Sequence, residues 1–315
     1  MPRGGSFKTS PFSSMSILIS GTVALDSIHT PTAAHNDLLG GSASYAGLAA
    51  ALSGPVHLCS IVGKDFPAEH SELFKGKGID TGNIEFADGR TFRWTGRYHE
   101  NMNHRETLDV SIDVLEKFAP KLCPAAAAAK VVLLANMSPD NQLAVLNQLT
   151  GRPFVIADSM DLWINIAREG LLKIVQRSDL FVINEDEAKM FTETSNLVTA
   201  GWRLMDMGPK QVVVKKGEHG ALLFGRGGSF FATPAFPLTG VADPTGAGDS
   251  FAGGLAGHVA SLGRAPCFTD LAAGVVRGSV LASFTCEEFG VRRLAFVTAA
   301  EATARLDSFR QFTAW

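Results

Sequence analysis

Short apolar runs separated by helical patterns fill the chain from residue 16 onward. Several runs are continuous rather than alternating, which is typical of strands buried on both faces of a parallel sheet. This arrangement predicts an α/β fold in which a central, mostly parallel sheet has helices on both faces. The expected strands are Ser16–Ser20, Val56–Ile61, Val131–Ala135, Phe154–Ala157, Leu180–Ile183, Val212–Lys215 and Ala221–Phe224. The expected helices between them are Ser42–Leu52, Asn141–Leu149, Leu162–Gln176, Asp186–Phe191 and Asn196–Met207.

The segment Thr91–Val110 departs from this pattern. Alternation places Phe92, Trp94 and Tyr98 on one face of a strand, with arginine and threonine side chains on the other. A strand of this kind suits a half-exposed sheet rather than a buried parallel one. We therefore expect a small accessory sheet, or lid, with strands from about 22–38 and 84–111.

Composition narrows the classes of protein and partner. Of 315 residues, 46% are hydrophobic and 19% charged, which is a globular balance. The net charge of -3, without a Lys/Arg cluster, argues against a nucleic acid or a membrane surface as partner. Lys130 interrupts the best candidate for a membrane span, so none is expected.

The N-terminal residues and the cysteines bear on the number of domains and on the cellular location of the protein. The serine-rich residues 1–15 are expected to be a flexible leader, followed by one domain over 16–315. The four cysteines lie far apart in sequence and form no C-x-x-C pair. We interpret them as small buried hydrophobic residues in a reducing compartment, which predicts a cytoplasmic location.

The strongest motif is Asp243–Ser250, which precedes a helical run at Phe251–Leu262. Gly246, Ala247 and Gly248 place small residues where a loop enters a helix. Free backbone N–H groups and the positive end of the helix dipole make such a junction an anion site suited to phosphate. Asp249 falls in the first helical turn. It could cap the helix or take a proton from an attacking hydroxyl, and spacing alone leaves both open.

A second motif, Asn184-x-x-Glu187, follows the expected strand Leu180–Ile183. The two side chains share a helix face and could orient a hydrated Mg²⁺ near phosphates. The same spacing is that of a capping box, which is the interpretation that spacing alone favours.

Two sites near the N-terminus are candidates for substrate binding. The pair Gly40-Gly41 opens a helix of small residues, which either permits close approach of a ligand or provides tight packing of helix on sheet. Asp26 lies just past the first strand, at the end where open α/β sheets bind ligands. It could equally be a turn residue.

Together these motifs resemble the ribokinase-like (PfkB) carbohydrate kinase family over nearly the whole chain after the leader. Asp243–Asp249 resembles the family's C-terminal signature D-T-x-G-A-G-D, with Pro244 in place of the usual Thr. The Gly40-Gly41 helix resembles the N-terminal signature, and Asn184-x-x-Glu187 is similar to the N-x-x-E magnesium motif. Lys216–Gly220 looks like the glycine loop that lines the nucleotide site. The implied fold is a three-layer sandwich with a small β-sheet lid, often used for homodimerisation.

The resemblance implies ATP-dependent phosphorylation of a hydroxymethyl group on a small sugar. Asp249 would be the general base, and Gly246, Ala247 and Gly248 would form the anion hole. The implied substrate-binding residues are Asp26, Gly40, Gly41, Tyr45, Phe92 and Trp94. The implied nucleotide-binding residues are Asn184, Lys215, Gly217, Gly220 and Ser279. Asn184 and Glu187 would hold Mg²⁺ through water, and Asp243 and Thr245 would lie near a monovalent-cation site, such as one for K⁺.

Two departures from the family pattern leave the substrate open. Tyr45 stands where family members usually carry an Asn that contacts substrate, and Ser279 stands near the nucleotide base where Asn is common. The alternative substrate is a nucleoside, which Phe92, Trp94 and Tyr98 would favour by stacking on its base. A remote alternative is a non-catalytic ligand sensor, against which the intact Asp249 and glycine-rich loop argue.

Overall fold

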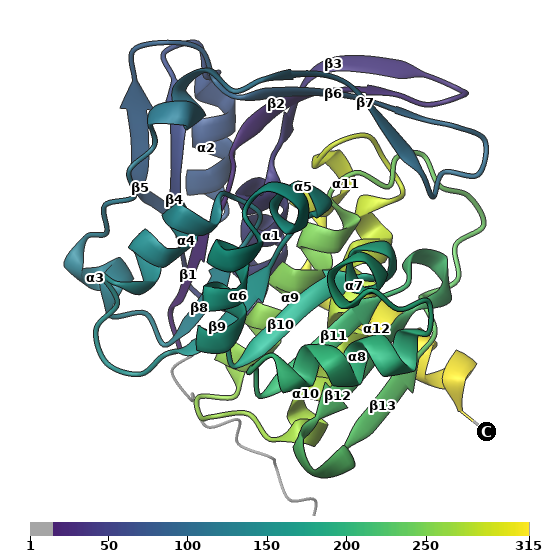
Figure 1. The fold of residues 1–315 in the computed structure, drawn as a ribbon. Helices are drawn as coiled ribbons and strands as arrows, with labels where there is room; N and C mark the ends of the chain where they lie inside the picture. The colour runs from purple at the N-terminus through teal and green to yellow at the C-terminus, as the bar shows by residue number, and fades with distance from the viewer. Residues whose placement is uncertain (1–14, 315) are drawn as a thin grey trace, which may run out of the picture.

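The computed structural model describes residues 15–314, and its main sheet has nine strands. Their order is β13-β12-β11-β10-β9-β8-β1-β4-β5 (Figure 1). Neighbours pair in parallel except at β11-β12 and β12-β13, so the predicted mostly parallel sheet is confirmed. The bounds are β1 (Ile17–Ser20), β4 (Val56–Gly63), β5 (Ile79–Ala87), β8 (Val131–Leu134), β9 (Phe154–Asp158), β10 (Leu180–Asn184), β11 (Gln211–Lys215), β12 (Ala221–Gly225) and β13 (Phe230–Thr233).

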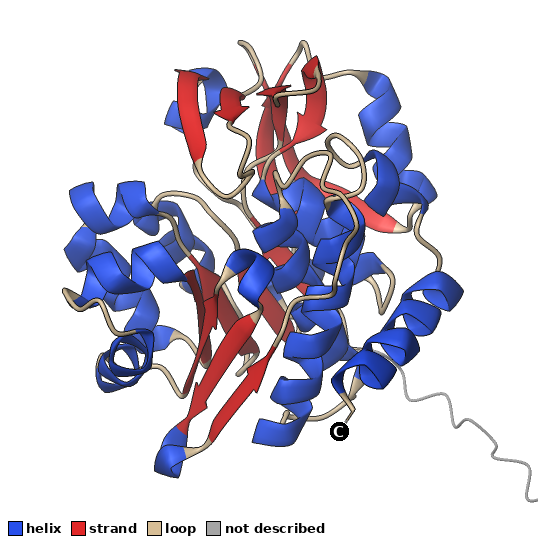
Figure 2. Ribbon diagram, turned by 90° about the vertical axis from the view of Figure 1, so that its right-hand side faces the viewer, coloured by secondary structure: helices blue, strands red, loops and turns tan. Residues whose placement is uncertain are grey.

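Helices cover both faces of this sheet (Figure 2). The helices on one face are α1 (Ser42–Ala51), α2 (Ala68–Gly76), α9 (Ala247–Ser261), α10 (Phe268–Thr285), α11 (Arg292–Phe296) and α12 (Ala299–Thr313). Those on the other are α3 (Pro124–Ala127), α4 (Pro139–Leu146), α5 (Asp161–Ile166), α6 (Arg168–Arg177), α7 (Glu185–Thr192) and α8 (Leu197–Asp206). The result is the three-layer sandwich that the resemblance implies.

Two apolar cores lie on either side of the sheet because successive strand residues point to opposite faces. In β1, Ile17 and Ile19 belong to one core while Leu18 belongs to the other. In β11, Val213 packs into the first core, and its neighbours Val212 and Val214 pack into the second. A strand buried on both faces needs apolar residues at every position, which is why these strands appear in the sequence as continuous apolar runs.

A separate four-stranded sheet, the lid, lies above the main sheet in Figure 1. Its order is β3-β2-β6-β7, with β2 and β6 parallel and the outer pairs antiparallel. The predicted range 84–111 is divided between the two sheets, because residues 84–87 belong to β5. The bounds of the lid strands are β2 (Ala24–His29), β3 (Ala34–Gly40), β6 (Arg93–Tyr98) and β7 (Arg105–Ser111).

The structure departs from the predicted elements at several places. The single helix expected over Leu162–Gln176 is two, α5 and α6, because Ala167 leaves helical geometry at φ -139° and ψ 35°. Strands β5 and β13, which were not among the expected strands, lie at the two edges of the sheet, and exposed polar residues such as Asp80 and Glu85 interrupt the apolar pattern of β5. Cys59 is buried, Cys123 and Cys286 are half-buried and Cys267 is exposed, so the prediction of buried cysteines is confirmed only for Cys59 and is wrong for Cys267. Among residues 15–314, no helix is long and apolar enough to span a membrane. The expected leader lies almost wholly outside the described residues.

Glycine at position 253 allows α9 to lie against α1. A Cβ added there would lie 2.2 Å from the carbonyl oxygen of Ala46, a backbone atom that cannot turn aside. We therefore expect Gly253→Ala to lower the free energy of unfolding by about 1–3 kcal/mol, the usual cost of overpacking. Equilibrium denaturation in urea measures the change.

The matched control is Gly76→Ala at the end of α2, where an added Cβ meets nothing within 4 Å. This substitution should stabilise the protein slightly, by about 0.4–1 kcal/mol, because it restricts the unfolded chain. Equal effects of the two substitutions would contradict the close packing of α9 on α1.

Candidate active site

The N-terminus of α9 is built on a left-handed turn at Gly246. Its φ is 76° and its ψ is 0°, a conformation that favours glycine. A Cβ at this position would also lie 2.4 Å from the ring of Tyr45, which is buried at 1% exposure. The Tyr45 ring therefore packs against Gly246 and supports the loop. Its hydroxyl is buried and has no hydrogen-bond partner within residues 15–314, and contact of Tyr45 with substrate stays a prediction.

Backbone N–H groups at this turn are available to an anion. Ala247 donates its N–H to the carbonyl of Pro244 at 3.2 Å, so it contributes less to the predicted anion hole than its neighbours. Gly246 and Gly248 make no such backbone bond among residues 15–314. They lie at the positive end of a 15-residue helix, where partial charge favours phosphate.

Asp249 lies in the first turn of α9 and is half-buried. Its carboxyl group interacts with its own backbone N–H in the first turn of the helix, so a contribution to capping and the role of general base both stay open. Burial raises the pKa of Asp249 to about 7, and the carboxylate of Asp158 adds to the rise. The positive charges of Lys215 and Arg105 oppose it. A carboxyl group poised near neutral pH is suited to accept a proton.

Lys215 brings a positive charge to the anion loop. Its Nζ donates to Asp158 Oδ2 at 2.9 Å, and a Cβ added at Gly248 would lie 3.1 Å from the same Nζ. Lys215 ends β11 and Asp158 ends β9, so the pair forms at the carboxyl edge of the parallel sheet. The attraction to Asp158 and Glu187 outweighs burial and raises the pKa of Lys215, which stays charged.

Asn184 and Glu187 form the capping box that their spacing favoured. Asn184 Oδ1 accepts the N–H of Glu187 at 2.9 Å, and Glu187 Oε2 accepts the N–H of Asn184 at 3.1 Å. Burial raises the pKa of Glu187 to about 7, and the positive charge of Lys215 opposes the rise. One carboxylate oxygen of Glu187 caps α7, and a role of this residue toward Mg²⁺ stays a prediction.

Asp26 comes from β2 of the lid and is 4% exposed. Burial raises its pKa to about 7, opposed by a hydrogen bond from the backbone of Gly41 and assisted by Asp243 and Asp249. A Cβ at Gly40 would lie 1.9 Å from Asp26 Oδ2, which explains the glycine there. Asp26, Gly40 and Gly41 are therefore one unit beside the anion loop.

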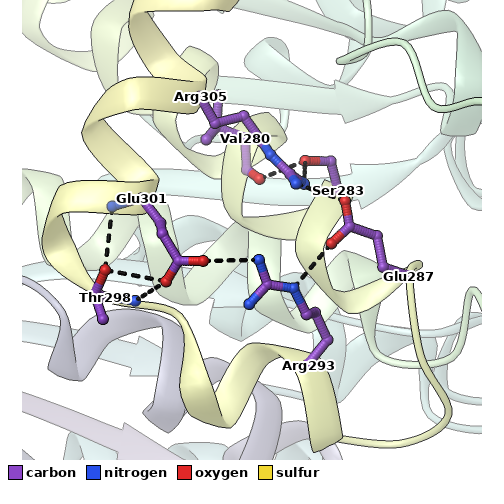
Figure 3. Close-up of polar contacts among 7 residues, drawn as sticks. All are labelled: Val280, Ser283, Glu287, Arg293, Thr298, Glu301 and Arg305. Atoms are coloured by element: carbon purple, nitrogen blue, oxygen red, sulfur yellow. Dashed lines mark hydrogen bonds and ion pairs between the residues drawn. The ribbon is translucent and has the colours of Figure 1, made fainter.

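Asp243 and Thr245 hold the loop to its surroundings. Asp243 is fully buried and accepts the N–H of Thr245 at 2.9 Å and that of Gly290 at 3.0 Å. Gly290 lies just after α10, in a segment fixed by ion pairs of Arg293 with Glu287 and Glu301, both at 3.0 Å (Figure 3). Both predicted cation-site residues thus have a structural role, and the monovalent cation itself stays a prediction.

The lid touches the body beside these groups. The Thr245 hydroxyl donates to the hydroxyl of Tyr98 at 3.1 Å, and Tyr98 is nearly buried. Trp94 lies in register with Asp26 across β6 and β2, so both side chains leave the same face of the lid. Phe92 lies just before β6 and is half-buried. Tyr98 therefore contacts the anion loop, and contact of Phe92 or Trp94 with substrate stays a prediction.

The predicted nucleotide residues are less closely grouped. Gly217 begins a short 3-10 turn (Gly217–His219) after β11, with φ 53°. At Gly220, an added Cβ would lie 2.0 Å from the carbonyl oxygen of Thr233, so packing on β13 already requires glycine there. Ser279 is buried in α10 at 8% exposure. Its role at the nucleotide base stays a prediction.

A comparison of this sequence with known protein families identifies the family of the chain. Residues 13–296 match the model of the pfkB family of carbohydrate kinases. The chain belongs to this family. It is therefore a kinase, a phosphotransferase that acts on hydroxyl groups. The family resemblance inferred from the motifs is confirmed.

Relatives of this pfkB-family kinase act on different acceptors. The cytidine kinase of Thermococcus kodakarensis is 33% identical over 258 residues, which are 79% of this chain and 90% of that protein. A Burkholderia thailandensis nucleoside kinase in complex with inosine has a TM-score of 0.75 at 19% identity, covering 93% of this chain and 96% of its own. An E. coli structure named ribokinase II, in complex with ATP and Mg²⁺, has a TM-score of 0.76 at 17% identity, covering 93% and 99%. The two structures confirm the fold.

Two residues of the candidate site, Asp158 and Arg105, escaped the sequence analysis. Asp158 directly follows the predicted strand Phe154–Ala157, and its place at a carboxyl strand end was the available signal. Lys215 was assigned only to the nucleotide, whereas it pairs with Asp158. Nothing in the sequence singles out Arg105, because one arginine in a half-exposed strand cannot be distinguished from any other exposed charged residue.

The raised pKa of Asp26 makes a prediction about stability and pH. Because the folded protein holds this proton up to about pH 7 and the unfolded chain releases it near pH 4, the contribution favours folding at low pH. It should disappear as the pH rises from about 4 to 7. We expect Asp26→Asn to remove a slope of a few kcal/mol over that range, at about 1.36 kcal/mol per pH unit.

Urea denaturation at pH 4.5 and pH 7.5 measures this slope as a difference between the wild type and the variant. Asp109→Asn, at an exposed position on β7, is the control and should keep the wild-type slope. A wild-type slope in the Asp26→Asn variant would show that Asp26 is ionised throughout.

Proposed function

We propose that this kinase transfers the γ-phosphoryl group of ATP to the hydroxymethyl group of a nucleoside. The observation that carries the proposal is a row of side chains across the lid: Asp26 pairs in register with Trp94, and Trp94 with Val110. A carboxylate, an indole and an apolar side chain therefore share one face. Val110 is 46% exposed, which leaves an apolar shelf open beside the buried carboxylate.

The row fits the chemistry of a nucleoside. A ribose presents hydroxyl groups that a carboxylate binds by hydrogen bonds, and its base presents a flat π-surface that stacks on an indole. Trp94 is held in place because its Nε1 donates to the Thr107 hydroxyl at 3.2 Å and its ring covers Gly96. A free small sugar, the acceptor expected from the motifs, would use Asp26 but leave most of the shelf uncovered. The names of the cytidine kinase and the inosine-bound nucleoside kinase support the same choice.

The residues around Asp249 supply the proton and charge chemistry. The acceptor hydroxyl gives its proton to the Asp249 carboxylate while its oxygen attacks the γ-phosphorus. The bond from that phosphorus to the β–γ bridging oxygen breaks, and ADP leaves. The N–H groups of Gly246 and Gly248 and the Lys215 ammonium stabilise the negative charge of the transferred group.

Magnesium fits this site as an ion that arrives with ATP. No cluster of three or more acidic, histidine or cysteine side chains suited to a metal occurs within residues 15–314. One or two carboxylates together with substrate phosphates are the usual protein environment of Mg²⁺, and Glu187 and Asn184 are placed to bind its waters. When bound, the ion neutralises phosphate charge.

Asp249→Asn tests the proton transfer. The amide keeps the size of the side chain but cannot accept the proton, so kcat should fall about 10²- to 10⁴-fold. ATP affinity by calorimetry and the melting temperature should stay near wild type. In the wild type, kcat/KM should rise with pH and level off above about pH 7, because the carboxyl must be ionised. Near-wild-type turnover by the variant on its best acceptor would disprove this role for Asp249.

Trp94→Ala tests the acceptor class. Loss of a stacking surface worth about 0.5–1.5 kcal/mol should raise the KM for a nucleoside roughly 2- to 10-fold and leave that for ATP unchanged. Steady-state assays over a panel of nucleosides and free sugars measure both. Phe86→Ala, at an exposed aromatic on β5, is the control.

The mass in solution by light scattering separates stacking from packing between lids. A smaller particle with an unchanged nucleoside KM would assign Trp94 to a dimer interface. Preference of the wild type for free sugars would reject the nucleoside proposal and leave the sugar kinase.

A further inference from the structure

The β6–β7 hairpin of the lid crosses the site and contacts the body at two points. At one point, Tyr98 at the end of β6 binds Thr245 of the anion loop, as described above. At the other, Asn103 in the hairpin turn donates its side-chain N–H to Glu218 Oε1 at 2.9 Å. Glu218 belongs to the glycine loop after β11. The hairpin therefore joins the loop that holds the transferred group to the loop expected at the nucleotide.

Arg105 begins β7 between these two contacts. It is the direct partner of Tyr98 in the antiparallel register, and direct partners project from the same face of a sheet. Since Tyr98 reaches the anion loop from that face, Arg105 leaves the lid toward the same place. Arg97 and Glu106, the neighbouring pair, project from the opposite face and lie 3.6 Å apart.

The guanidinium of Arg105 makes no ion pair among residues 15–314, and its partner in the lid is the aromatic ring of Trp94. The ion pairs of the lid strands and their turn, as far as residues 15–314 show them, use Arg93, Arg97 and His99. Arg105 is exposed and lies 6.0 Å from the ring of Trp94.

The charge of Arg105 acts on carboxylates from three separate elements. It lowers the pKa of Asp26 on β2, of Glu187 on α7 and of Asp249 on α9. A group that acts on all three faces the space enclosed by them. That space is where the acceptor, the anion loop and the end of the ATP phosphates meet in the proposed function.

We propose that Arg105 is a further catalytic residue, which binds the γ-phosphoryl group from the lid side during transfer. The inference rests on the proposed function for the identity of the acceptor. Lys215 approaches the phosphoryl group from the sheet, and Arg105 completes the positive surroundings from the opposite side. A planar guanidinium binds two phosphate oxygens at once, which a lysine ammonium does not do.

Arg105→Ala, Arg105→Lys and the control Arg97→Ala test the assignment. For Arg105→Ala we expect kcat to fall about 10²- to 10³-fold, as when one preorganised donor is removed. The nucleoside KM should change less than about threefold. Arg105→Lys should regain only part of kcat, and Arg97→Ala, on the other face of the same hairpin, should stay within about twofold of wild type. A kcat for Arg105→Ala within about threefold of wild type would overturn the proposal, as would an equal loss in Arg97→Ala.

A binding measurement without acceptor separates this result from the proposed function. Calorimetry measures the affinity for ADP in the presence of Mg²⁺, with and without aluminium fluoride, which mimics the phosphoryl group during transfer. The wild type should bind ADP more tightly when the fluoride is present, and Arg105→Ala should lose that gain while keeping its affinity for ADP alone. An equal gain in both proteins, or none in the wild type, would overturn the role of Arg105. If the protein phosphorylates no nucleoside, the proposed function is wrong, but this comparison of ADP affinities still tests the role of Arg105.

Discussion

The contact between the Tyr45 ring and Gly246 is the constraint on which the site depends. It accompanies a left-handed turn at the entry to α9, where the N–H groups of Gly246 and Gly248 make no backbone hydrogen bond among residues 15–314. Any side chain at position 246 would collide with the ring. The position of Asp249 follows from the same contact, because Asp249 lies three residues into a helix whose start cannot shift.

Several titratable side chains around this turn are buried or half-buried, so their charged forms are poorly solvated. Asp26, Glu187 and Asp249 each have a pKa raised to about 7, and burial is the largest cause in each case. Such groups are costly to ionise until positive charge arrives. Lys215 supplies that charge from the sheet. The three carboxyl groups thus share a single electrostatic environment although they come from the lid and from both helical layers.

The sequence predicted the layers of the fold more completely than it predicted which residues meet at the candidate site. Continuous apolar runs identify strands such as β1 and β11 because both of their faces are buried, and the sheet order then follows the family fold. The motif at Gly246–Asp249 is local, so its geometry could be predicted from adjacent residues.

Pairings between distant strands could not be predicted in the same way. Asp158 and Lys215 are 57 positions apart, and only the parallel order of β9, β10 and β11 brings them together. The pairing of β6 with β7, which places Arg105 opposite Tyr98, includes a register shift that leaves no clear signature in the sequence. Trp94 lies beside Asp26 through the parallel pairing of β2 with β6, which joins residues 68 positions apart. Tyr45 shows the same limit: its packing against Gly246, 201 positions away, could not be predicted from the sequence, and its contact with substrate stays a prediction.

The distribution of tyrosine gives the molecule an unusual property. The chain contains two tyrosines, and both lie at the junction of lid and body: Tyr45 beneath the anion loop and Tyr98 at the tip of β6. Replacing tyrosine with 3-fluorotyrosine throughout the protein would therefore place one fluorine nucleus on each side of that junction and none elsewhere. The ¹⁹F resonances of the two rings would report separately on the body and on the lid, without any engineered label.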